Sequence, residues 1–109
     1  MVYDEGLAEL VREKLEDQVG YSEKKMFGGL CFMLHGNMIC GIVKNQLMAR
    51  VAKESYESVL QEPHVMEMDF TGRPLRGLIY IDEDGSNDEE VLEEWVRRSL
   101  ENARTLPPK

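Results

Sequence analysis

Arg73 and Arg76 lie in a loop bounded by glycines, and Lys24 and Lys25 follow one another earlier in the chain. A pair of arginines can hold a carboxylate or a phosphate through parallel hydrogen bonds. These four cations are therefore the best candidates for an anion-binding site. The alternative is structural: Arg73 pairs with Asp69 and rigidifies the turn, while the two lysines protect a strand end from pairing with another chain.

Cys31, Cys40 and His35 are the side chains that could bind a soft metal ion. If Gly36-Asn37 form a two-residue turn, all three lie on one sheet face, with diagonal separations of about 7–8 Å. Zinc needs four closely spaced ligands, however, and the sequence has no such spacing. Cys31 and His35 are also about 13 Å apart along one strand, too far for a nucleophile and its base. We expect two buried structural thiols and no metal site.

The sequence shows no cofactor loop. The residues around Gly28 and Gly29 do not fit a phosphate-binding loop, and glycines inside a strand mark a bulge or a close backbone approach. The acidic stretch 82–88 is not a calcium loop, because Tyr80 and Val91 would occupy its first and last ligand positions. We therefore expect no cofactor, and the sequence favours a non-enzymatic domain over an enzyme.

Hydrophobic periodicity predicts the element order αβββαββα. The predicted elements are a helix at about 4–18, strands at 26–34, 38–43 and 46–51, a short helix at 53–61, strands at 65–68 and 78–81, and a final helix capped by Ser86 or Asn87. Tight turns between the first three strands indicate an antiparallel meander. We expect one domain, 1–109, with a two-layer α+β fold and a five-stranded, largely antiparallel sheet.

Both faces of this meander are apolar, although an antiparallel sheet with one wet face should alternate. With the turn at Gly36-Asn37, one face holds Leu30, Phe32, Leu34, Ile39, Gly41 and Val43, and the other holds Cys31, Met33, His35, Met38, Cys40 and Ile42. If the helices cover one face, a second copy of the chain is the commonest cover for the other. The alternative is that the helices divide between the faces. Because Met also lines adaptable binding surfaces, we expect a protein interface at Met33, Met38, Cys40 and Ile42.

Composition disfavours two classes of partner. The 109 residues include 13 Lys and Arg against 21 Asp and Glu, a net charge of −8. Such a field repels phosphate, so direct binding to nucleic acid or to an anionic membrane is not expected. No apolar run is long enough to span a membrane, the N-terminus does not read as a targeting segment, and two cysteines suit a reducing compartment. We expect a cytoplasmic protein.

Several motifs resemble the N-terminal domain of the TfoX (Sxy) competence regulators. They are Lys24-Lys25-Met26-Phe27-Gly28-Gly29, Phe32-Met33, Gly36-Asn37-Met38, Gly41-Ile42, the loop Asp69-Phe70-Thr71-Gly72-Arg73-Pro74-Leu75-Arg76-Gly77, and the ending Leu106-Pro107-Pro108-Lys109. The resemblance covers essentially the whole chain in the right order. It implies a two-layer fold similar to secretion-chaperone domains and a bacterial or archaeal cytoplasmic protein.

Full-length members of this family carry a second, C-terminal domain and assist a cyclic-AMP receptor transcription factor at competence promoters. The resemblance therefore implies a regulatory role, and we expect a stand-alone member because the chain ends where the first domain ends. The family offers no catalytic residues to transfer. Our leading hypothesis is a homodimeric, non-enzymatic regulatory or protein-interaction domain that acts as a transcriptional coregulator. The alternative is a small-anion-binding protein or an enzyme that uses the Arg73 and Arg76 loop.

Overall fold

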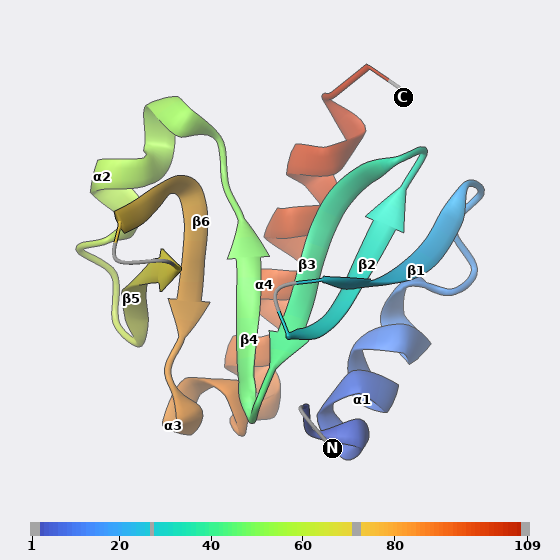
Figure 1. Cartoon of the computed structure of the whole chain (residues 1–109), viewed down its shortest axis with the longest axis horizontal. Coiled ribbons are helices and arrows are strands. Elements are labelled where there is room, and N and C mark those ends of the chain that lie inside the picture. The colour runs from blue at the N-terminus through green and yellow to red at the C-terminus, as the bar shows by residue number, and fades with distance from the viewer. Residues whose placement is uncertain (1–2, 27, 71–72, 108–109) are drawn as a thin grey trace.

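The computed structural model describes residues 3–26, 28–70 and 73–107, and for residues 26, 68–70 and 73–76 it describes the backbone alone. Within these ranges six strands form one antiparallel sheet in the order β1-β2-β3-β4-β6-β5 (Figure 1). The strands are β1 (Tyr21–Met26), β2 (Gly29–Leu34), β3 (Asn37–Val43), β4 (Gln46–Arg50), β5 (Val65–Phe70) and β6 (Arg73–Ile81). The predicted α+β class with an antiparallel sheet is confirmed.

The helices are α1 (Glu5–Leu15), a 3-10 turn η1 (Lys53–Ser55), α2 (Tyr56–Val59), α3 (Glu83–Ser86) and α4 (Glu89–Arg104). Helix α1 begins where the carboxylate of Asp4 accepts a hydrogen bond from the Leu7 amide at 3.1 Å. Helix α4 begins at Asp88, which accepts from the amides of Glu90 and Val91. The expected cap at Ser86 or Asn87 is therefore wrong.

The Ser86 hydroxyl has a different role. It is buried, accepts a hydrogen bond from the Leu47 amide and donates one to the Ile81 carbonyl, each at 2.9 Å. The side chain thus ties the short helix α3 to strands β4 and β6, and it satisfies backbone groups that would otherwise be buried without a partner.

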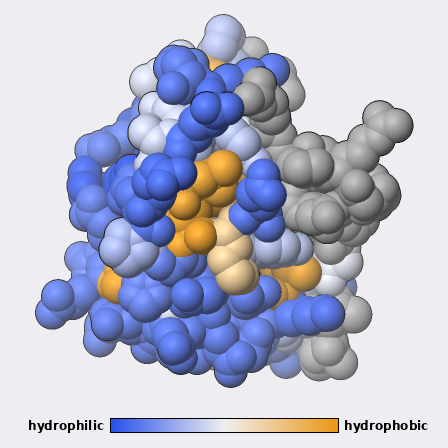
Figure 2. Space-filling model, turned by 90° about the vertical axis from the view of Figure 1, so that its left-hand side faces the viewer, coloured by the Kyte–Doolittle hydropathy of each residue, from blue (hydrophilic) through white to orange (hydrophobic). Residues whose placement is uncertain are grey.

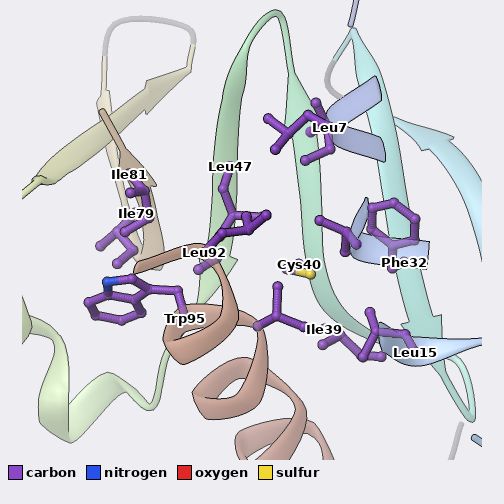
Figure 3. Close-up of a cluster of buried hydrophobic side chains, with 14 of the residues drawn as sticks. Leu7, Leu15, Phe32, Ile39, Cys40, Leu47, Ile79, Ile81, Leu92 and Trp95 are labelled. Atoms are coloured by element: carbon purple, nitrogen blue, oxygen red, sulfur yellow. The ribbon is translucent and has the colours of Figure 1, made fainter. Parts of the chain in front are cut away.

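One side of the sheet, which we call the helix face, carries the main core. Its strand residues pack against the buried sides of α1, α2 and α4. Figure 1 shows α4 running behind β3 and β4, and Figure 3 shows Leu92 and Trp95 of α4 beside Leu47, Ile79 and Ile81 of the sheet. These five residues are at most 4% exposed, so a continuous apolar layer joins helices and sheet.

The sixth strand corrects the expectation of a single strand through 26–34. The chain forms a hairpin there, because Gly28 has a φ of +73°, in the left-handed region that favours glycine. Gly29 then lies so close to β3 that an added Cβ would be 2.0 Å from the Ile42 carbonyl oxygen. The close approach expected of these glycines is confirmed at Gly29. Strand β1 was missed because Lys24 and Lys25 belong to a polar run without alternating hydrophobicity.

The turn between β2 and β3 also differs from the expectation. Leu34 pairs with Asn37, so the turn residues are His35 and Gly36, with φ of +50° and +84°. The register then shifts, because Phe32 pairs with Cys40 while Met33 pairs with Met38. A bulge of this kind adds one residue on one strand and changes which side chains share a face. The face assignment of Cys40 depends on this single residue.

Candidate protein-interaction surface

The face of the sheet opposite the helices, which we call the second face, is rich in methionine and other apolar residues. The pairing of the strands places fourteen described residues on it: Ser22, Lys24, Gly29, Cys31, Met33, Met38, Gly41, Val43, Gln46, Met48, Arg50, Met66, Leu78 and Tyr80. Successive side chains of a strand point to opposite faces, and paired residues point to the same one. The second face is thus a surface distinct from the helix-covered core.

One row of paired residues crosses all six strands. It runs from Lys24 through Cys31, Gly41, Met48 and Tyr80 to Met66. At Gly41 an added Cβ would lie 2.9 Å from Met48 Cε and 3.3 Å from Cys31 Sγ. The missing side chain at Gly41 therefore lets these two sulfur-containing side chains close over the middle of the sheet.

The centre of the second face is buried within the single chain. Cys31 and Met48 are 0% exposed and Met38 is 7% exposed. The apolar residues around them, Met33, Val43, Leu78 and Tyr80, are only half-buried. A second copy is thus not needed to bury the centre, and the surface left for a partner is the half-buried rim.

Two of the four predicted interface residues lie on this face. Met33 and Met38 belong to its cluster, whereas Cys40 and Ile42 lie on the helix face and are 0% exposed. The expected place of Cys40 and Ile42 on the second face is wrong, because the turn at His35 and the following bulge shift the register. Figure 3 shows Cys40 among the core side chains, near Ile39.

The two cysteines point to opposite faces, so the arrangement with His35 on one face is wrong as well. Both are free and buried. Burial raises the pKa of the Cys31 thiol to about 11, and it raises the pKa of Cys40 further, with a contribution from Cys31. Both side chains therefore stay in the unreactive thiol form at neutral pH.

The four predicted anion-binding residues are not assembled into one site. Lys24 pairs with Cys31 and lies on the second face, while Lys25 pairs with Leu30 and lies on the helix face of the same strand. Arg73 and Arg76 lie in β6, and their side chains are outside those that the structure describes. Strand β1 is an edge strand, where lysines discourage pairing with another chain.

Other charged groups hold elements together. Arg98 of α4 makes two hydrogen bonds of 2.8 Å to the carboxylate of Glu62, and its Cζ lies 4.0 Å from the centroid of the Trp95 ring. Arg98 holds the pKa of Glu62 below its usual range. On the other side, Arg12 of α1 binds Glu23 of β1 at 2.5 and 2.9 Å. The first pair connects α4 to the segment between α2 and β5, and the second connects α1 to the sheet. Both pairs therefore have a structural role.

Figure 2 shows the side of the molecule on which α2 and β5 lie, where apolar residues gather in a small patch surrounded by hydrophilic ones. The segment from α2 to β5 includes the half-buried Leu60 and Val65 and the more exposed Met66. Met66, on the edge strand β5, also belongs to the second face.

Two searches for other kinds of site concern the described residues alone. Among them, no group of three His, Cys, Asp or Glu side chains is close enough to hold a metal ion. Within the same ranges, every helix is too short or too polar to cross a membrane.

The sequence also matches the model of a known protein family. The family model of the TfoX N-terminal domain matches residues 13–103, which is most of the chain. No match is found among curated proteins or among solved structures.

Proposed function

Since the chain belongs to the TfoX N-terminal domain family, we propose that it is a regulatory protein-binding domain that recruits its partner through the second face of the sheet. The family suggests a competence-regulator-like domain, and a transcription factor as the class of partner. On this proposal residues 1–109 act as one non-enzymatic domain in the cytoplasm, where its two free thiols stay reduced.

The rim of the second face is the observation that carries this proposal. Met33, Val43, Leu78 and Tyr80 are apolar or aromatic and half-buried, although the helices pack on the opposite face. Methionine and tyrosine suit such a surface, since Met adapts to different shapes and Tyr adds a large, stiff contact. A partner that covers this rim would remove apolar surface from water.

The test compares the proteins captured by three tagged versions of the chain from the lysate of its own host. Met33→Asp places a charge on the rim, whereas Val19→Asp is the matched control, because Val19 is 85% exposed outside this face. We expect the wild-type chain and Val19→Asp to recover the same partner, and folded Met33→Asp to lose it. Equal recovery by all three would contradict the proposal.

A second candidate function is binding of a small anion. Gly77, which follows Arg76, lines a cleft of about 300 Å³ with Arg50 and Lys53. The test is thermal stabilisation by phosphate compounds. We expect Lys53→Ala and Arg76→Ala to reduce it; unchanged stabilisation in both variants would exclude this site.

A further inference from the structure

The charge on the second face is opposite in sign to the charge of the whole chain. Of its fourteen described residues, two are cations, Lys24 and Arg50, and none is a carboxylate. The chain as a whole carries 21 acidic residues and a net charge of −8. In the described part of the protein, the acidic residues thus lie elsewhere, and the described side chains of the second face carry two positive charges and no negative one.

Both cations are available to a partner. Lys24 is exposed and Arg50 is half-buried. Within the described ranges neither forms an ion pair, whereas Arg12, Arg97 and Arg98 each bind at least one glutamate. A cation with no partner within its own chain can bind a carboxylate from another molecule without first breaking an internal pair.

The positions of the cations define the shape of the surface between them. Lys24 lies on β1 and Arg50 on β4, three strand spacings apart, which is about 14 Å along the sheet. Met33 and Met38 lie on the two strands between them, and Leu78 is paired with Arg50. The second face therefore carries one cation on the edge strand β1 and one on β4, with apolar side chains on the strands between them and on those beyond β4.

We propose that the second face binds an acidic amphipathic segment of a partner protein. This inference rests on the proposed function and names the chemistry of its partner. Apolar side chains of the segment cover the rim formed by Met33, Val43, Leu78 and Tyr80, and its carboxylates pair with Lys24 and Arg50. Complementary charge speeds encounter and rejects unsuitable partners.

The same charges disfavour a second copy as the occupant. Two copies joined through this face would bring their lysines and arginines toward one another, and like charges brought together at an interface cost free energy. The centre of the face, moreover, is already buried within one chain. A partner with carboxylates matches the surface better than the chain matches itself.

The experiment uses a random peptide library selected on the folded full chain. The selected peptide that binds tightest, and that Met33→Asp no longer binds, is synthesised as the probe. Its affinity is then measured for Lys24→Glu, Arg50→Glu and the control Lys25→Glu, which makes the same charge change on the same strand but on the opposite face.

We expect the probe to be rich in Asp and Glu. Lys24→Glu and Arg50→Glu should each weaken its binding roughly three- to tenfold, as expected for surface ion pairs, while Lys25→Glu should change it less than about twofold. Added salt should reduce the difference between Lys24→Glu and Lys25→Glu.

A neutral or basic probe, or equal effects of Lys24→Glu and Lys25→Glu, would overturn the acidic-partner inference and leave the proposed function intact. If Met33→Asp abolishes the binding of none of the selected peptides, both the acidic-partner inference and the proposed function are overturned. A chain that sediments as a dimer, and as a monomer when folded Met33→Asp is used, would show that a second copy occupies the face, and would likewise overturn the inference.

Discussion

The two glycines of the β1–β2 hairpin should differ sharply in their tolerance of a methyl group. In Gly29→Ala, the added Cβ would lie 2.0 Å from the carbonyl oxygen of Ile42 and 3.0 Å from its carbonyl carbon. Both are backbone atoms of the neighbouring strand, so they cannot rotate away. In Gly28→Ala, the Cβ would meet nothing within 4 Å, and the cost would come only from the φ of +73°.

The magnitudes follow from these contacts. Gly28→Ala should cost about 1–2 kcal/mol, the usual penalty for an L-residue in the left-handed region. Gly29→Ala must push β2 away from β3, which adds overpacking of about 1–3 kcal/mol to the loss of one or two ladder hydrogen bonds at about 1 kcal/mol each. We therefore expect about 2–5 kcal/mol at Gly29, a large part of the stability of a small domain.

The assay is urea unfolding followed by tryptophan fluorescence, since Trp95 is the only tryptophan and is buried in the core. The free energy of unfolding should fall in the order wild type, Gly28→Ala, Gly29→Ala. An equal or larger loss in Gly28→Ala would refute the close approach of β2 to β3, because the two strands would then not meet at Gly29. A Gly29→Ala chain that does not fold, beside a folded Gly28→Ala chain, also agrees with the reasoning.

Three other predictions concern the core, an ion pair and a thiol. Ile42→Asp should unfold the chain because Ile42 is fully buried among core residues, whereas Met33→Asp should keep its fold. Circular dichroism checks this, and a native spectrum for both variants would contradict it. A double-mutant cycle on Glu62 and Arg98 should give a coupling of about 1 kcal/mol. Because Arg98 lowers the Glu62 pKa, that coupling should be present above about pH 4.5 and be lost as the pH falls further; a coupling that persists in acid would be inconsistent. Since burial raises the Cys31 pKa to about 11, the free energy of unfolding should fall as the pH rises from about 9 to 11, and it should fall less in Cys31→Ala. An aromatic disulfide reagent should modify Cys31 only after the chain unfolds.

Part of the fold could be predicted because its signals are local. The antiparallel meander follows from apolar runs separated by turns, and α4 follows from the spacing of Leu92 and Val96. Strand β1 carries no such signal, since its exposed polar residues are held by pairing with β2 rather than by their own hydrophobicity. Its existence depends on the hairpin at Gly28, where the sequence indicated only a bulge or a close backbone approach.

The candidate surface was only half predictable. The apolar character of Met33 and Met38 is visible in the sequence. The face on which Cys40 lies, however, depends on the turn, which is formed by His35 and Gly36 and not by Gly36 and Asn37, and on a bulge after Met38. Shifting a strand by one residue moves its side chains to the other face. The separation of Lys24 from Lys25 also required a strand at that position. Arg50 was missed because its role appears only through its pairing with Leu78.

The most direct test of the account places a photo-crosslinking amino acid, p-benzoylphenylalanine, at Tyr80 in the living host. Tyr80 is a half-buried aromatic residue on the second face, so the replacement keeps an aromatic ring at this position and adds the photoreactive benzoyl group in place of the hydroxyl. Leu10 on α1, which is 44% exposed, is the control position. The account predicts a covalent adduct with a different protein from position 80 and not from position 10. Adducts from position 10 alone, or an adduct at position 80 made only with a second copy of the chain, would contradict it.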